Sequence, residues 1–320
     1  MISGGDIYGR KFKTLRVSLI NTCNLGCVYC ACGQDETRDK YKQQQEKALP
    51  ATEMLRIIEN LHRQLDLQTL RLTGGEPLLY KDLDLIVKGG ADLGIKDIAL
   101  TTNALLLAQQ AEKLKRAGLK SINVSLDAID ENTSFEISRR RGLHRILQGI
   151  DKAIECGLEV KLNTVIMKGI NEHQILPLLE YAFDRGLKIR FLEIMAMGHL
   201  HENPGQYFFS RQEILSVVET RHSILPLKRE TGATANYWQT GRNNIFGVIA
   251  NETAPFCSDC DRLRLDSFGN IYGCLSSNSP ISVIQPDDAA DLNDKLIQAM
   301  SQKQMFKFTG SDLSMMHIGG

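Results

Sequence analysis

The chain is organised around one stretch, Cys23-Asn24-Leu25-Gly26-Cys27-Val28-Tyr29-Cys30. It places three cysteines in a C-x3-C-x2-C pattern directly after the apolar run from Leu15 to Ile20, which alternates like a β-strand. Three thiolates brought together by one short loop suit a metal centre. An iron–sulfur cluster suits them better than zinc, because a structural zinc ion takes four protein ligands and a fourth is missing nearby. A zinc site or chance spacing are the alternatives.

The composition sets limits on the class of protein. The chain has 320 residues, 42% of them hydrophobic, and 38 Lys plus Arg balance 38 Asp plus Glu. This length allows one large domain or a barrel with an appendage, and the balanced charge argues against binding to nucleic acid or an anionic membrane. No apolar run approaches the ~18 residues of a membrane span, and residues 1–10 do not resemble a signal peptide. We therefore expect a cytoplasmic protein with reduced thiols.

Six strand–helix units follow one another through the first part of the chain. Several of the helices stop at a glycine just before the next strand, which is a common C-cap. The predicted strands are 15–20, 69–73, 98–102, 121–126, 160–167 and 188–195, and the predicted helices are one capped by Thr52, then 82–93, 106–117, 143–156 and 173–185. This alternation predicts a parallel sheet, either open or curled into a barrel.

Polar side chains recur at regular positions within these strands. A flat sheet with helices on both faces buries apolar residues on both sides, and unpaired charges there would be costly. The polar positions are Arg16, Ser18, Arg71, Thr73, Asn123, Ser125, Lys161, Asn163, Arg190 and Glu193. We therefore predict an α/β fold, a partial (β/α)6 barrel of the TIM type whose polar interior holds a large polar ligand.

The pattern changes after Gly198. Residues 211–221 and 291–302 predict helices, and 225–275 read as an antiparallel β region. We predict a barrel domain over 1–222 and a C-terminal α+β region over 223–320. That region holds a second cysteine triplet, spaced C-x2-C-x13-C: Cys257, Cys260 and Cys274. It suits a second cluster with an open iron or, less well, a structural zinc ion.

Two further motifs point to bound ligands. In Gly74-Gly75-Glu76-Pro77, the glycines allow backbone to approach a ligand and Glu76 offers a partner for an ammonium group, although a tight strand–helix turn explains the same residues. Arg262 and Arg264 alternate on an extended segment, so both side chains point the same way. Paired guanidinium groups suit phosphates, and exposed arginines of a hairpin are the alternative.

Strand ends supply other candidates. Thr102 and Asp127 follow strands where barrels carry their chemistry, but they could equally cap the following helices. The remaining cysteines, Cys32 and Cys156, are expected to be incidental thiols.

Taken together, these motifs resemble the radical S-adenosylmethionine (SAM) enzymes and, within them, the MoaA family of GTP 3′,8-cyclases in molybdenum cofactor synthesis. The likeness covers nearly the whole chain. It rests on the two cysteine triplets and on Leu15-Arg16-Val17-Ser18, Leu72-Thr73-Gly74-Gly75-Glu76-Pro77-Leu78, Asn123-Val124-Ser125-Leu126-Asp127-Ala128, the Arg262-x-Arg264 pair and the terminal Ile318-Gly319-Gly320.

The resemblance implies two 4Fe–4S clusters, one on each cysteine triplet, with SAM bound at the open iron of the first. Reductive cleavage of SAM would give a 5′-deoxyadenosyl radical that takes the 3′ hydrogen of GTP held at the second cluster. The ribose carbon would then attack C8 of guanine. The implied product is (8S)-3′,8-cyclo-7,8-dihydroguanosine 5′-triphosphate.

The resemblance also implies roles for individual residues. The SAM-binding positions would be Tyr29, Gly74, Gly75, Glu76, Ser125 and Met195. The GTP-binding positions would be Arg16, Arg71, Thr101, Lys161, Arg262 and Arg264. Gly319 and Gly320 would form a tail that enters the active site and is needed for hydrogen abstraction, whereas the residues alone would suggest a disordered end.

The implied partners are GTP as substrate, an electron donor and a cyclic pyranopterin monophosphate synthase that receives the product, and a homodimer is allowed. The chain departs from the family pattern at Asn21-Thr22, Ala31-Cys32, Thr69 and Asp261. Two other interpretations stay open. One is a radical SAM enzyme with an auxiliary cluster that acts on another nucleotide or a peptide, and the other is a non-catalytic nucleotide-binding relative.

Overall fold

A computed structural model describes residues 5–30, 48–201 and 204–319. Within these residues one sheet of 12 strands runs through the molecule, in the order β12-β11-β10-β1-β2-β3-β4-β5-β6-β9-β8-β7. Its centre is parallel and follows the chain, which confirms the predicted strand order: β1 Thr14–Ser18, β2 Thr69–Thr73, β3 Asp97–Thr102, β4 Ser121–Ser125, β5 Glu159–Ile166 and β6 Lys188–Glu193.

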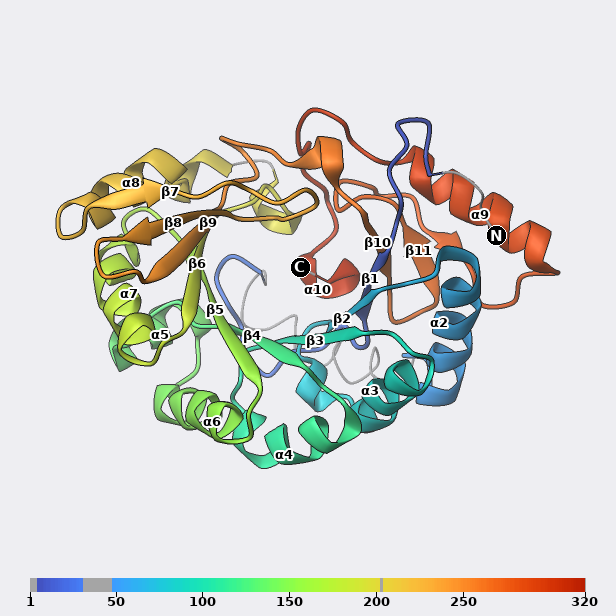
Figure 1. Cartoon of the computed structure of the whole chain (residues 1–320), viewed down its shortest axis with the longest axis horizontal. Coiled ribbons are helices and arrows are strands. Elements are labelled where there is room, and N and C mark those ends of the chain that lie inside the picture. The colour runs from blue at the N-terminus through green and yellow to red at the C-terminus, as the bar shows by residue number, and fades with distance from the viewer. Residues whose placement is uncertain (1–4, 31–47, 202–203, 320) are drawn as a thin grey trace.

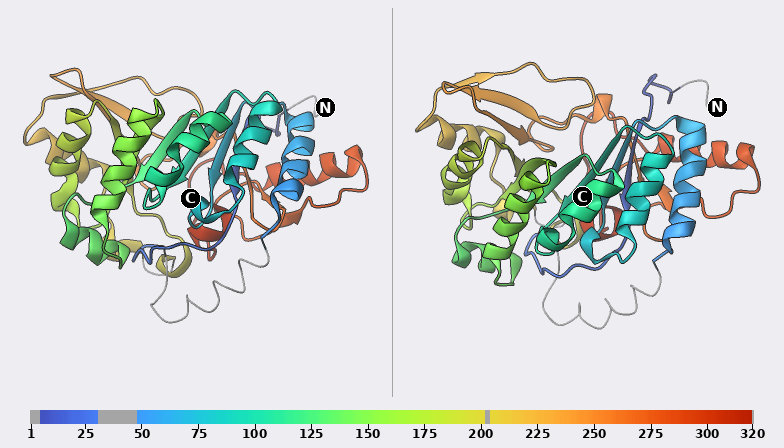
Figure 2. Two further views of the ribbon diagram at one scale, coloured as in Figure 1. Left: turned by 90° about the horizontal axis from the view of Figure 1, so that it is seen from below. Right: turned by 60° about the horizontal axis from the view of Figure 1, so that its bottom comes forward.

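Helices cover the convex side of this curved sheet, as Figures 1 and 2 show. They are α2 Ala51–Leu65, α3 Leu83–Asp92, α4 Leu107–Ala117, α5 Glu131–Ser138, α6 Leu143–Glu155 and α7 Ile175–Asp184. The predicted cap at Thr52 is wrong, because α2 already begins at Ala51, with Pro50 as its N-cap and no side-chain cap bond. Helix α5 was not predicted, since its sequence ENTSFEIS is short and lacks a continuous apolar face.

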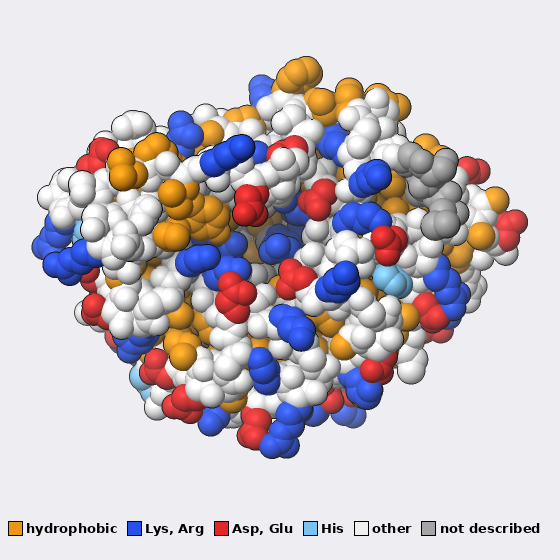
Figure 3. Space-filling view, viewed as in Figure 1, with side chains coloured by type: hydrophobic (Ala, Val, Ile, Leu, Met, Phe, Trp, Pro, Cys, Tyr) orange, Lys and Arg blue, Asp and Glu red, His pale blue; other side chains and the backbone are white. Residues whose placement is uncertain are grey.

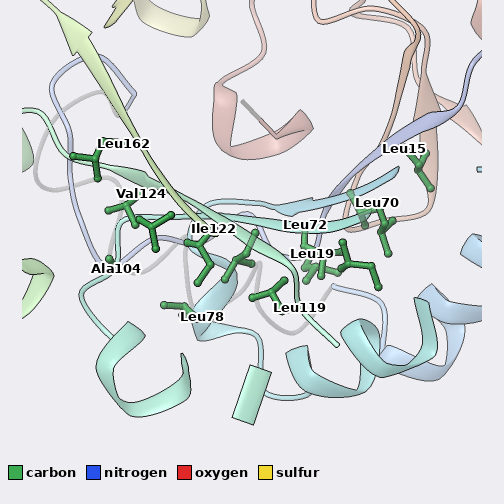
Figure 4. Packing of buried hydrophobic residues seen from close by; sticks show 14 of the residues in the cluster. Leu15, Leu19, Leu70, Leu72, Leu78, Ala104, Leu119, Ile122, Val124 and Leu162 are labelled. Atoms are coloured by element: carbon green, nitrogen blue, oxygen red, sulfur yellow. The ribbon is translucent and has the colours of Figure 1, made fainter. Parts of the chain in front are cut away.

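The apolar core lies between the sheet and these helices. Leu15, Leu70, Leu72, Ile122 and Val124 are fully buried there, and Figure 4 shows their side chains on the helix side of the strands. Because neighbouring residues of a strand point to opposite faces, the intervening polar residues must face the concave side. The strand sequences therefore place apolar groups against the helices and polar groups in the interior.

The C-terminal strands extend both edges of the parallel sheet. Strand β9 joins β6 in parallel, and β10 joins β1 in parallel, while the rest pair as antiparallel ribbons. The bounds are β7 Ile224–Pro226, β8 Asn236–Thr240, β9 Ile245–Ile249, β10 Arg262–Leu265, β11 Asn270–Tyr272 and β12 Ile281–Ser282. The predicted antiparallel pairing is thus correct among β7, β8 and β9 and among β10, β11 and β12. It is wrong where β9 meets β6 and where β10 meets β1, because these pairs are parallel.

Three later helices complete the fold: α8 Arg211–Glu219, α9 Ala289–Ser301 and α10 Met315–Ile318. Single turns of 3-10 helix lie at Pro77–Leu79, Glu172–Gln174, Gly198–Leu200, Pro204–Tyr207 and Cys257–Asp259. Figure 1 shows α10, near the C-terminus, inside the concave space beside β1. In the part of the chain that the structure describes, no helix is long and apolar enough to span a membrane.

Candidate active site

Two cavities lie on the concave side of the sheet. One, here called the cysteine cavity, is lined by residues that include the N-terminal cysteine triplet and the glycine turn after β2. The other, the arginine cavity, is lined by residues that include Arg16, Arg71, Arg190, Arg262 and Arg264. In Figure 3 the molecule is hollowed at its centre, and Lys and Arg side chains lie in and around the hollow together with Asp and Glu at its rim.

The two cavities adjoin. Asn163, Leu192 and Met315 line both of them. Asn163 and Leu192 come from neighbouring strands, and Met315 begins α10. These three side chains therefore contact both cavities.

The glycine turn holds the cysteine loop through backbone contacts. Gly75 N donates to Ile20 O at 2.6 Å, and Glu76 N donates to Thr22 O at 2.7 Å. Gly74 has φ +151°, and a Cβ added to Gly75 would lie 2.1 Å from Thr22 O. Only glycine fits at such an approach. The turn therefore fixes the chain immediately before Cys23.

We expect Gly75→Ala to displace the cysteine loop, because backbone at 2.1 Å must move to admit a methyl group. The variant should lose most of the iron bound by the N-terminal triplet, and it should be destabilised by roughly 1–3 kcal/mol, the usual cost of overpacking. Iron content after anaerobic reconstitution and urea unfolding measure the two effects. Gly205→Ala is the matched control, because its added methyl group meets nothing within 4 Å. Equal iron content in both variants would contradict this role of the turn.

Glu76 is buried, and its carboxylate accepts hydrogen bonds from other residues of the protein. It accepts from Leu78 N at 2.9 Å, Thr102 Oγ1 at 2.6 Å and Asn103 N at 2.8 Å. Asn103 Nδ2 in turn donates to Asn24 Oδ1 at 2.7 Å. Burial raises the pKa of Glu76 to about 7, although the donated hydrogen bonds lower it. This carboxylate thus orders the rim of the cysteine cavity.

The raised pKa of Glu76 predicts a pH dependence of stability. A carboxyl whose folded pKa lies above its unfolded value stabilises the fold only while protonated, so this contribution is lost as pH rises from about 4.5 to about 7. At ~1.36 kcal/mol per pKa unit, the loss for the metal-free protein is roughly 3 kcal/mol. Urea unfolding across this range should show a shallower pH slope for Glu76→Gln. An identical slope would contradict the assignment.

Tyr29 and Asp127 face each other in the cysteine cavity. Tyr29 OH donates to Asp127 Oδ2 at 2.8 Å, and Val165 N donates to Asp127 Oδ1 at 2.9 Å. Burial raises the pKa of Asp127 to about 6. The capping alternative for Asp127 is wrong, because Asp130 caps α5. Asp127 instead fixes the tyrosine between two cysteines of the triplet.

The donor sets fit iron–sulfur clusters. Both triplets are free, partly exposed thiols. In the second triplet, burial raises the pKa of Cys260, but Lys303 and Arg262 outweigh it and lower this pKa to about 6. In the first triplet, burial raises the pKa of Cys23 to about 12 and of Cys30 to about 11. Such neutral thiols become good ligands only when a cationic centre compensates the thiolate charge. Among the described residues, no group of three or more His, Cys, Asp and Glu is packed to hold a single metal ion. Cluster cysteines bind separate irons and need not converge so closely.

The arginine cavity concentrates positive charge. Burial and then the neighbouring Arg264, Arg71, Arg262 and Arg190 lower the pKa of Arg16 well below its usual value. Buried donors remain unused there: Arg16 Nε and Arg262 Nη2 have no hydrogen-bond partner among the described residues. Unpaired guanidinium groups in a buried site are costly unless an anion joins them. The cavity is therefore built for a multiply charged anion.

The C-terminal tail connects the two cavities. Ser314 Oγ donates to Cys30 O at 3.1 Å, and Ser18 Oγ donates to Met316 O at 3.3 Å. Arg264 Nη1 donates to Ile318 O at 3.3 Å and also to Gly319 O. Gly319 is buried, so the tail is ordered up to this residue, against the alternative of a disordered end. Gly320 and Cys32 lie outside the described residues.

The other predicted positions distribute over both cavities. Thr101, assigned to GTP, lines the cysteine cavity together with Ser125, and Met195, assigned to SAM, lines the arginine cavity. Lys161 pairs with Glu159 at 2.8 Å, and neither cavity includes it among the described lining residues. Arg190 was predicted only as an interior polar residue. Its place on β6, opposite Asn163 of β5, is the signal that could have made it a site residue.

Comparisons with known proteins show which families this sequence resembles. The sequence model of the Radical SAM superfamily matches residues 17–182, and that of Molybdenum Cofactor Synthesis C matches residues 187–308. A GTP 3′,8-cyclase of Synechocystis sp. is 38% identical over 278 residues, 87% of this chain and 83% of its own. A GTP 3′,8-cyclase of Staphylococcus saprophyticus is 40% identical over 276 residues, 85% and 81% of the two chains.

Solved structures support the fold. SuiB of Streptococcus suis bound to S-adenosylmethionine matches with a TM-score of 0.64 and 17% identity, over 91% of this chain and 67% of its own. Native anSMEcpe with bound AdoMet matches with a TM-score of 0.59 and 12% identity, over 90% and 81%. The chain therefore belongs to the radical SAM superfamily and, within it, to the MoaA family of GTP 3′,8-cyclases.

Proposed function

We propose that this protein is a GTP 3′,8-cyclase that acts in molybdenum cofactor synthesis. The observation that carries the proposal is the pair of adjoining cavities, one lined by a cysteine triplet and the other by five arginines. A radical formed beside the cysteines can reach a nucleotide in the arginine cavity without crossing solvent. The relatives named GTP 3′,8-cyclase are 38% and 40% identical to this chain over more than four fifths of both lengths.

In this proposal, two parts of the chain contribute different residues to the active site. Residues 1–222 supply most of the cysteine cavity, and Met315 and Met316 of the tail complete it; a 4Fe–4S cluster and SAM bound there would supply a 5′-deoxyadenosyl radical. Tyr29 and Asp127 hold one side of this cavity, and Gly75, which also lines it, lets the turn pack against the backbone before Cys23. Residues 223–320 supply the second cysteine triplet and the arginines of β10.

Binding of GTP follows from the charges. The triphosphate neutralises Arg16, Arg71 and Arg190, whose guanidinium groups face one space from three strands. Arg262 is held by its bond to Gly232 O at 2.8 Å. The family resemblance implies that the guanine lies at the second triplet, and the ribose would then lie toward the residues shared by both cavities, Asn163, Leu192 and Met315. The tail excludes water from the cysteine cavity, because Met315 and Met316 line it.

The partners of the reaction are part of the proposal. An electron donor is needed to start each turnover, and a cyclic pyranopterin monophosphate synthase is the expected next enzyme. A cytoplasmic location suits the seven described cysteines, which are all free. A homodimer is compatible with the proposal and is tested by size-exclusion chromatography with light scattering.

Anaerobic turnover tests the proposed function. The reconstituted and reduced protein is incubated with SAM and GTP, and products are identified by mass spectrometry. We expect 5′-deoxyadenosine together with 3′,8-cyclo-GTP. 5′-Deoxyadenosine without a cyclised nucleotide would overturn the GTP assignment and favour another substrate. Absence of 5′-deoxyadenosine from a protein that holds both clusters would favour the non-catalytic relative.

A further inference from the structure

Lys303 touches a cysteine of the second triplet, and the proposed mechanism does not use it. The residue follows the end of α9. Its ammonium group donates to Cys260 Sγ at 3.0 Å and to Arg262 O at 2.7 Å. It also lies 5.5 Å from the centre of the Phe12 ring. The ammonium group of Lys303 therefore has three partners: the Cys260 sulfur, the Arg262 carbonyl and the Phe12 ring.

The partners of Lys303 are themselves fixed. Phe12 is buried in the core, and it precedes β1. Arg262 begins β10, which pairs with β1 through the register Thr14 to Arg262. The backbone of Lys303 is held by the bond from its N–H to Met300 O at 3.1 Å. A cation held this firmly keeps its place relative to Cys260 with little loss of side-chain freedom.

Arg10 ties the other side of the triplet to the same segment. Its Nη1 donates to Cys257 O at 2.8 Å and to Gln304 O at 3.2 Å, and its Nε donates to Asp6 Oδ2 at 2.6 Å. Gln304 is the residue next to Lys303. One buried arginine therefore holds both Cys257, the first cysteine of the triplet, and the segment that carries Lys303, which contacts Cys260.

We propose that Lys303 is a positioning residue of the C-terminal cluster that raises its reduction potential by donating to the Cys260 sulfur. The inference rests on the proposed function for the presence of that cluster. Reduction adds negative charge to a cluster, and hydrogen bonds to its sulfurs together with nearby positive charge stabilise the reduced form. Lys303 is not among the described residues that line either cavity, so its nearest anionic partner is the cysteine rather than the substrate.

The test is a redox titration of the full chain, reconstituted without oxygen and followed by electron paramagnetic resonance. The signal of the C-terminal cluster is assigned by comparison with a Cys23→Ala, Cys27→Ala, Cys30→Ala variant. For Lys303→Met we expect at least a tenfold lower ratio of reduced to oxidised C-terminal cluster at a fixed potential. For one electron this is a midpoint lower by about 59 mV. Lys303→Arg, which keeps a cationic donor, should restore part of the shift.

Lys295→Met is the matched control, because it removes the same charge from α9, where Lys295 pairs with Asp291 at 2.7 Å and with no other acidic group of the described residues. Equal midpoints for the Lys303→Met and Lys295→Met proteins would overturn the inference. If Lys303→Met holds too little iron, Lys303→Gln is titrated instead under the same criterion. A parent protein without a C-terminal cluster signal would instead overturn the second cluster of the proposed function.

Discussion

Replacing Arg16 with methionine should weaken GTP binding and at the same time stabilise the nucleotide-free protein. Arg16 stands among four other arginines, and its buried Nε has no partner among the described residues. An unsatisfied buried donor costs roughly 1–3 kcal/mol, so its removal should raise the free energy of unfolding by about that amount. Loss of a charge-assisted bond to phosphate should lower affinity for GTP by about 10- to 150-fold.

Arg116→Met is the control for this prediction, since Arg116 is exposed on α4 and forms an ion pair with Glu112 of the same helix. It removes the same charge far from the cavity in the fold. Calorimetric titration with GTP and urea unfolding without nucleotide measure the two effects. A less stable Arg16→Met protein that binds GTP normally would show that the arginines serve the fold and not the substrate. Binding of SAM should be unchanged in both variants.

Replacing Gly319 with alanine should uncouple SAM cleavage from product formation. Gly319 has φ +69°, and an added Cβ would lie 2.4 Å from Thr73 Cγ2 and 3.6 Å from Ser18 Cβ. The stiff, β-branched threonine cannot turn away, so the tail must move. A misplacement of ~1 Å near reacting groups can cost about 10²-fold in rate. We expect a loss of this size in cyclised product.

A second substitution makes this prediction specific. Thr73→Ser removes the methyl group that the new Cβ would meet, so the Thr73→Ser, Gly319→Ala protein should recover part of the product. Thr73→Ser alone should keep near-parental turnover. The ratio of 5′-deoxyadenosine to cyclised nucleotide is the measurement. Failure of the double variant to recover would show that backbone strain at Gly319, and not the contact with Thr73, sets its role.

The sequence predicted the parallel centre of the fold because its signals are local. Strand β2 runs over 69–73 as expected, and α4 ends before Gly118, which takes φ +110°. The joining of β9 to β6 and of β10 to β1 was not predicted, because it depends on contacts between residues far apart in the sequence, such as Ile189 with Phe246 and Thr14 with Arg262. Helix α5 was missed since packing, and not its own weak apolar pattern, makes it a helix.

The candidate site also combines features that the local sequence predicts with features that depend on distant contacts. Alternation on an extended segment correctly predicted that Arg262 and Arg264 face one space. Contacts made by the ends of long side chains were beyond the sequence, as for Tyr29 with Asp127 or Lys303 with Cys260. The sequence pattern does not predict which of the two adjoining cavities Thr101 or Met195 lines, because the answer depends on the three-dimensional arrangement of the strand ends.

Transfer of a labelled hydrogen tests the central claim most directly. The reconstituted protein is supplied with SAM and with GTP that carries deuterium at C3′, and 5′-deoxyadenosine is analysed by mass spectrometry. If the cysteine cavity delivers its radical to a nucleotide in the adjoining arginine cavity, one deuterium appears in 5′-deoxyadenosine and the cyclised product lacks it. Unlabelled 5′-deoxyadenosine beside intact, fully labelled GTP would contradict the account.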